Sequence, residues 1–189
     1  MKPPIVVYDA CVLYPAALRD LLMHLALTDL YQAKWTEEIH DEWIRNVLLN
    51  NAHLTCKQLE RTRKLMNEHV DYCLVYDYQK LIPSLTLPDQ HDRHVLAAAI
   101  QAKASLIVTY NLKDFPDSSL KKYGVQAVHP DQFIISLLDR NAEAVCDAVR
   151  TLRRSLKNPP VAAEDYVNFL QQHALFKTVE KLRFFSDRL

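Results

Sequence analysis

Glycine is almost absent from this sequence, since Gly124 is the only one among 189 residues. A Walker A loop, a Rossmann GxGxxG turn and a GxSxG nucleophile elbow all need glycines, either for tight turns or for close approach of the backbone to a ligand. The single glycine therefore excludes a glycine-cradled phosphate site and an elbow serine. It also disfavours a flavodoxin-like receiver or a nucleotide-binding sheet.

Cysteines are few, and none of them form a CxxC pair. The four are Cys11, Cys56, Cys73 and Cys146. Three of them lie in apolar or helical contexts, which is typical of reduced thiols in a cytosolic protein. No apolar run approaches the roughly 20 residues that span a bilayer, and the N-terminus does not resemble a signal peptide. The sequence predicts a cytoplasmic protein without a membrane span.

The sequence also has no excess of charge of either sign, because 23 Lys and Arg residues balance 23 Asp and Glu residues. The chain as a whole has no basic stripe that would mark a DNA-binding module. Residues 140–189 nevertheless carry nine basic and six acidic side chains, against 14 and 17 in residues 1–139. A basic cluster there comprises Arg150, Arg153, Arg154 and Lys157. It is either a solvated helix end or a patch in which side chains such as Arg153 and Arg154 contact phosphate groups.

Apolar runs alternate with helical patterns along the first 139 residues. Buried strands are predicted over residues 5–8, 106–109 and 125–128, and helices over residues 15–31, from Thr36, over residues 56–70, from Pro88-Asp89, and from Pro130. Gly124 has the place of a left-handed residue that closes a short helix. This alternation predicts an α/β fold with a parallel sheet and helices on both faces.

The last 50 residues, from Arg140, predict helices alone, interrupted at Asn158-Pro159-Pro160. We therefore expect two parts, a sheet domain over residues 1–139 and a helical C-terminal extension over residues 140–189.

Four carboxylates fall where such a fold would bring them together. Asp9 and Asp114 follow two predicted strands, and the carboxyl ends of parallel strands meet at one edge of a sheet. Glu42 borders the apolar stripe of its helix, and Asp92 lies near the start of the helix that includes residues 95–100. Each has a structural alternative. Strand-end acids often turn the chain or cap the next helix, Glu42 could be a surface acid of its helix, and Asp89 and Asp92 could be an N-cap and a first-turn acid.

Crowded carboxylates raise one another's pKa unless a cation neutralises them. Oxygen ligands without thiolates select Mg²⁺ or Mn²⁺ rather than zinc. One or two such ions activate water and stabilise charge on a phosphoryl oxygen, so the four acids indicate hydrolysis of phosphodiester bonds. A zinc hydrolase built on His91 and His94 is an alternative, although no HExxH motif is present.

The ordered set of motifs resembles the PIN-domain ribonucleases. It consists of Asp9 after a first strand, Glu42 on a later helix, and residues 14–20 (YPAALRD), 87–99 (LPDQHDRHVLAAA) and 108–116 (VTYNLKDFP). These stretches look like one bacterial subgroup, the larger VapC-like toxins of toxin–antitoxin systems. The resemblance extends over about residues 4–139, and the helical tail resembles an extension seen in that subgroup.

The resemblance implies a three-layer α/β/α sandwich, endonucleolytic cleavage of RNA with Mg²⁺ or Mn²⁺, and a small antitoxin whose peptide covers the cleft. It makes Asp9, Glu42, Asp92 and Asp114 the catalytic metal ligands. It makes Thr109, Asn111 and Asp89 supporting groups. Many relatives carry Asp at the position of Asn111, so the neutral amide here shifts the fourth ligand role to Asp114. A PIN-like RNA- or protein-binding module without catalysis is the alternative, and a homodimer is left open.

Overall fold

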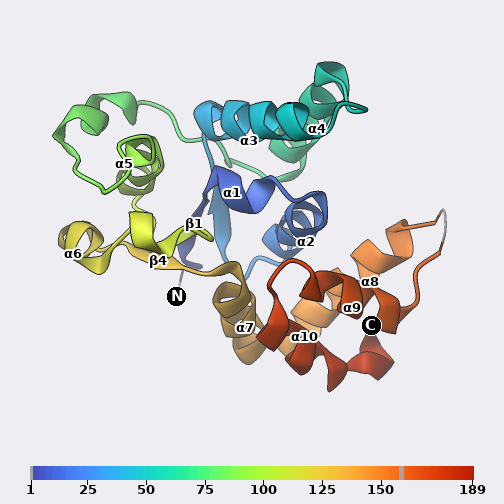
Figure 1. Ribbon diagram of the computed structural model, residues 1–189. Coiled ribbons are helices and arrows are strands. Elements are labelled where there is room, and N and C mark those ends of the chain that lie inside the picture. Colours follow the sequence, from blue (N-terminus) through green and yellow to red (C-terminus); the bar gives the residue numbers. More distant parts are fainter. Residues whose placement is uncertain (1, 158–159) are drawn as a thin grey trace. The chain divides into compact units, whose positions relative to one another are not determined.

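The structure is a computed structural model that describes residues 2–157 and 160–189. The chain forms two compact units (Figure 1). The sheet unit contains the residues up to Tyr14 and Tyr31–His129, and the helical unit contains Pro15–Leu30 and Pro130–Leu189. The helical unit thus takes up more of the chain than the expected extension. The domain boundary expected after residue 139 stays a prediction.

The sheet unit is built on four parallel strands in the order β2-β1-β3-β4. The strands are β1 (Ile5–Tyr8), β2 (Gln32–Lys34), β3 (Leu106–Val108) and β4 (Gln126–Val128). Strand β2 was not predicted, because the helix expected to reach Tyr31 ends at Ala26. Asp29 has a φ of 58°, and this left-handed residue falls in the turn before β2.

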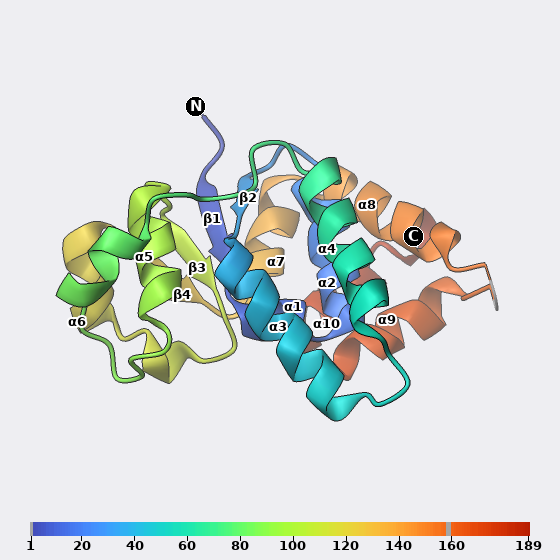
Figure 2. The same ribbon diagram turned by 90° about the horizontal axis from the view of Figure 1, so that it is seen from above.

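Helices and short 3₁₀ turns connect these strands. They are α1 (Ala10–Leu13), α3 (Glu37–Asn50), α4 (Cys56–His69), η1 (Gln79–Ser84), α5 (Arg93–Gln101), η2 (Leu112–Asp114), α6 (Asp117–Leu120) and η3 (Lys121–Tyr123). The hydroxyls of Thr36 and Thr55 cap α3 and α4 as predicted, and Gly124 closes η3 with a φ of 69°. Helix α5 packs on β1 and β3 (Figure 2). The parallel sheet with its surrounding helices confirms the three-layer α/β/α fold class.

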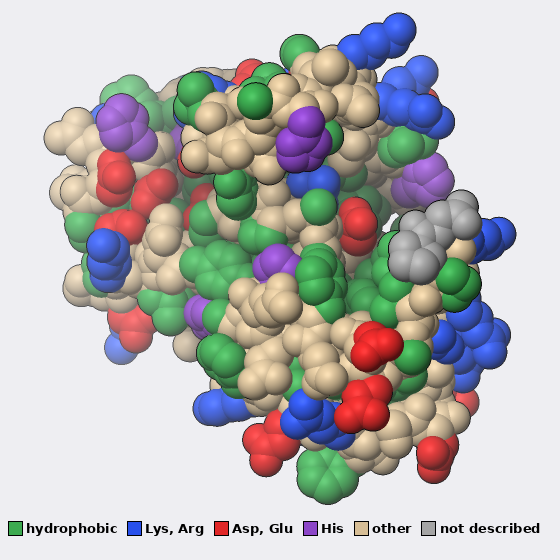
Figure 3. All heavy atoms as spheres, turned by 45° about the vertical axis from the view of Figure 1, so that its right-hand side comes forward, with side chains coloured by type: hydrophobic (Ala, Val, Ile, Leu, Met, Phe, Trp, Pro, Cys, Tyr) green, Lys and Arg blue, Asp and Glu red, His purple; other side chains and the backbone are tan. Residues whose placement is uncertain are grey.

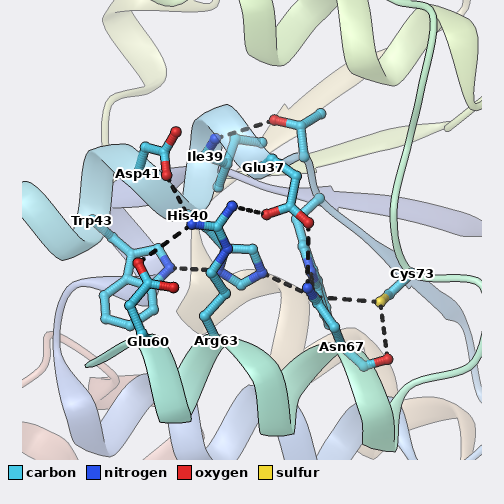
Figure 4. Close-up of polar contacts among 11 residues, drawn as sticks. Glu37, Ile39, His40, Asp41, Trp43, Glu60, Arg63, Asn67 and Cys73 are labelled. Atoms are coloured by element: carbon cyan, nitrogen blue, oxygen red, sulfur yellow. Dashed lines mark hydrogen bonds and ion pairs between the residues drawn. The ribbon is translucent and has the colours of Figure 1, made fainter. Parts of the chain in front are cut away.

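A polar network fastens α4 to α3 and to the residue after β2 (Figure 4). The indole N–H of Trp43 donates to Nδ1 of His40 at 2.9 Å, so Nε2 of this ring carries the proton and donates to Oδ1 of Asn67 at 3.0 Å. The same Oδ1 accepts the indole N–H of Trp35 at 2.8 Å. Burial lowers the pKa of His40, which agrees with a neutral ring. The network fixes how α3 lies against α4.

The helical unit contains α2 (Ala16–Ala26), α7 (Pro130–Arg140), α8 (Ala142–Ser155), α9 (Ala163–Gln171), α10 (Phe176–Arg183) and η4 (Ser186–Arg188). The buried carboxylate of Asp131 on α7 accepts the backbone N–H groups of Lys177 and Thr178, and so satisfies the start of α10. Of the predicted interruption, Asn158 and Pro159 lie outside the described residues. No helix within residues 2–157 and 160–189 is long and apolar enough to cross a membrane.

Candidate active site

Asp9 is held at the carboxyl end of β1 with 2% of its surface exposed. It occupies the N-cap position of α1, but its side chain makes no capping hydrogen bond. Oδ2 instead accepts hydrogen bonds from the Thr109 hydroxyl at 2.6 Å and the Cys11 thiol at 3.0 Å. Burial raises the pKa of Asp9, and these two hydrogen bonds oppose that shift. The carboxylate is therefore oriented by a side chain of α1 and by the residue that follows β3.

Thr109, the proposed supporting residue, contacts the carboxylate of Asp9. It follows β3 directly and is fully buried. Its hydroxyl oxygen accepts the backbone N–H of Asn111 at 2.9 Å while it donates to Asp9. The exposed Asn111 precedes η2, and η2 ends at the half-buried Asp114. The turn after β3 thus links the two candidates for the fourth ligand to the carboxylate of Asp9.

Glu42 is tied to a histidine that sequence reasoning did not assign. Nε2 of His94 lies 3.3 Å from Oε2 of Glu42, and His94 is buried at the start of α5. Burial lowers the pKa of His94, but the hydrogen bond to Glu42 and the nearby carboxylate charges outweigh it and raise the pKa above its ordinary value. The sequence suggests His94 only as half of a zinc pair with His91, and its position two residues after Asp92 is the signal that could have found it.

Asp92 is at the N-cap position of α5 without a side-chain capping bond. Its Oδ2 is buried and has no hydrogen-bond partner among the described residues. Burial, followed by the charges of Asp9, Asp89, Asp114 and Glu42, raises the pKa of Asp92 to about 7. The structure therefore brings Asp9, Glu42 and Asp114 within electrostatic reach of Asp92.

Asp89 has a different environment from the other acids. It is exposed, and its Oδ1 accepts the backbone N–H of His91 at 2.8 Å. This bond forms a local turn before α5, so Asp89 is not the N-cap that the structural alternative required. Its charge still contributes to the raised pKa of Asp92.

The donor set fits a hard divalent cation in its chemistry. Within the described ranges, no group of three His, Cys, Asp or Glu side chains is already arranged to hold a metal ion. A bound cation would nevertheless compensate for the buried Oδ2 of Asp92, which has no hydrogen-bond partner among the described residues. It would also reduce the repulsion between the carboxylates. The four carboxylates would offer oxygen ligands alone, and the nearby imidazole of His94 contacts Glu42. This composition suits Mg²⁺ or Mn²⁺ better than zinc.

The basic cluster of the helical unit is partly used in holding the chain. Arg153 donates to the carbonyl oxygens of Val161 at 2.8 Å and Leu189 at 3.2 Å. Arg150 donates to the carbonyl oxygen of Arg188 at 3.0 Å, whereas Arg154 is exposed. Figure 3 shows Lys and Arg side chains gathered along one edge of the face that it draws. These contacts favour a structural role for Arg153 and leave Arg154 accessible to a ligand.

Comparisons with known proteins match both parts of the chain. The PIN-domain family matches residues 5–113, and the VapC50 C-terminal domain matches residues 130–184. The chain is 38% identical over 95 residues to a Mycobacterium tuberculosis protein (strain ATCC 25618 / H37Rv) named "Putative ribonuclease VapC50". That alignment covers 50% of this chain and 56% of the relative, so the chain spans little more than half of that protein's length. No solved structure matches the chain.

Proposed function

Because this chain belongs to the PIN-domain family, we propose that it is a metal-dependent endoribonuclease, the toxin of a type II toxin–antitoxin pair. The substrate is RNA, and the reaction is hydrolysis of its phosphodiester bonds. The similarity to a protein named as a ribonuclease supports this proposal, as does the match to the VapC50 C-terminal domain.

One observation carries the proposal. The buried Oδ2 of Asp92 has no partner in the described part of the chain, and the surrounding carboxylates raise its pKa to about 7. A protein gains nothing in stability from such crowding, because each charge opposes the others. Perturbed acids of this kind cluster at functional sites, and a cation is the ligand that relieves them.

Asp9, Glu42, Asp92 and Asp114 would hold Mg²⁺ or Mn²⁺. The ion would lower the pKa of a bound water and stabilise negative charge on the phosphoryl oxygen. Thr109 keeps Asp9 in place through its hydroxyl, and His94 keeps Glu42 in place through Nε2. Asn111 orients Thr109 through its backbone N–H and leaves its own amide side chain for a water or a substrate oxygen.

A small antitoxin protein is the proposed partner, and its peptide would cover the four acids. The four cysteines are free thiols in the structure, which supports a reducing compartment such as the cytoplasm.

Cleavage of RNA by the purified protein tests this function. Cleavage products are expected with Mg²⁺ or Mn²⁺, and none with EDTA. The matched control is Asp117→Asn, which removes an exposed carboxylate at the start of α6 and should cleave like the wild type. A wild-type protein that binds RNA or a partner and does not cleave with either ion would favour the binding-module alternative.

A further inference from the structure

Two side chains donate hydrogen bonds to the same oxygen of Asp9. The Thr109 hydroxyl and the Cys11 thiol both contact Oδ2, at 2.6 and 3.0 Å, and neither of these side-chain donors contacts Oδ1. The Cys11 sulfur and the Thr109 oxygen lie 3.3 Å apart. Oδ2 thus accepts hydrogen bonds from two neutral side chains that are 98 positions apart in the sequence. The backbone N–H of Ala10 is a further hydrogen-bond donor to this carboxylate.

Backbone amides determine the direction of both bonds. The N–H of Tyr110 donates to Sγ of Cys11 at 3.2 Å, and the N–H of Asn111 donates to Oγ1 of Thr109 at 2.9 Å. Each amide occupies one of the two lone pairs of its partner, and the thiol and the hydroxyl each donate their single proton to Oδ2 of Asp9. The turn after β3 therefore sets the orientation of Asp9 through Cys11 as well as through Thr109.

The thiol of Cys11 is a neutral donor to Oδ2 of Asp9 in this position. A protonated thiol donates without adding charge to a site that already contains several carboxylates. Cys146 is a buried thiol as well, but it lies on α8 in the helical unit, far along the chain from the acids.

We propose that Cys11 is a positioning residue for catalysis, whose thiol holds Oδ2 of Asp9 so that Oδ1 is the oxygen presented to the divalent cation. This inference rests on the proposed function. Neutral groups that orient a metal ligand in this way contribute to the affinity of the site, and their removal typically costs about 10- to 100-fold in metal affinity or activity.

The experiment compares Cys11→Ala, which removes the donor, with Cys11→Ser, which keeps one. Cys11→Val repeats the removal with an apolar side chain that fills the space, and Cys146→Ala is the matched control for loss of a buried thiol. Mn²⁺ binding to the metal-free protein is measured by calorimetric titration, melting temperature is measured without metal, and kcat and KM are measured for RNA cleavage.

We expect Cys11→Ala and Cys11→Val to bind Mn²⁺ roughly tenfold more weakly, with a lower kcat and an unchanged KM. Cys11→Ser should bind within about threefold of the wild type, and Cys146→Ala should bind like the wild type. A merely structural thiol would lower the melting temperature and leave Mn²⁺ affinity and kcat unchanged.

Two results would overturn the inference. One is wild-type Mn²⁺ affinity in a folded Cys11→Ala or Cys11→Val protein. The other is a roughly tenfold loss of affinity in Cys11→Ser, in spite of its hydroxyl donor, whatever the other variants do. A wild-type protein that neither binds Mn²⁺ nor cleaves RNA would instead refute the proposed function, and this inference with it.

Discussion

The hydroxyl of Thr109 lies 2.6 Å from Oδ2 of Asp9 and donates a hydrogen bond to it across one hundred positions of sequence. This bond joins the carboxyl ends of β1 and β3, which are adjacent strands in the sheet. It explains how a carboxylate with 2% exposure keeps one orientation while burial raises its pKa. Asp9 is therefore held by this chain's own residues, and the members of the site can be tested one at a time.

Asp9→Asn should abolish cleavage, with a loss of more than about 100-fold, because the cation loses a charged ligand. The metal-free variant should melt at the same temperature as the wild type or higher, since one repelling charge is gone. Mg²⁺ should raise the melting temperature of the wild type by mass action and that of the variant much less. Retained nuclease activity in Asp9→Asn would show that Asp9 is not a ligand.

Asp114→Ala should reduce cleavage more than Asn111→Ala. A neutral amide cannot offset a divalent charge, whereas the carboxylate of Asp114 already influences the pKa of Asp92. The backbone N–H of Asn111 that supports Thr109 remains in the alanine variant, so the second substitution removes only the amide side chain. Steady-state kinetics of the two variants at matched Mg²⁺ would decide the assignment, and a larger loss from Asn111→Ala would reverse it.

Asn67→Leu should lower the free energy of unfolding by about 2–4 kcal/mol, because it leaves the buried N–H groups of Trp35 and His40 without their shared acceptor. Urea denaturation measures the change. Asn50→Leu is the control, since the exposed Asn50 donates only to a backbone oxygen within α3, and its loss should cost well under about 1 kcal/mol. Equal effects of the two substitutions would mean that the network contributes little.

Arg154→Ala should weaken RNA binding and reduce the slope of log affinity against log salt by about 0.7–0.9, the value for one lost phosphate contact. Mn²⁺ affinity should not change. Arg153→Ala should instead lower the melting temperature, because Arg153 holds the carbonyl oxygens of Val161 and Leu189.

The double neutralisation of Arg153 and Arg154 would combine both effects, so the single variants are the informative ones. Arg61→Ala, which removes an exposed cation of α4, serves as the control for net charge. An unaltered salt slope in Arg154→Ala would favour the solvated helix end over the RNA-contacting patch.

Local signals determined much of this protein from the sequence alone. The caps at Thr36 and Thr55 and the left-handed Gly124 lie where they were predicted, because each depends on residues within a few positions. The β-branched runs predicted β1 and β3, and the rule that parallel strands end at one edge then predicted that Asp9 and the turn after β3 would meet. The resemblance to PIN domains had the same source, an ordered set of short motifs.

Only the tertiary structure decided which partner each polar side chain has. Strand β2 has only three residues, of mixed polarity, so its own sequence does not predict a strand. Pairing with β1 stabilises it. The sequence predicted reduced cysteines but no partner for Cys11. In the structure its sulfur contacts Tyr110 and Thr109, from the turn after β3. The sequence placed Arg153 in a basic cluster without partners, whereas in the structure it donates to the carbonyl oxygens of Val161 and Leu189. Hydrogen bonds need their atoms within about 3 Å, and for residues tens of positions apart the folded chain alone provides that distance.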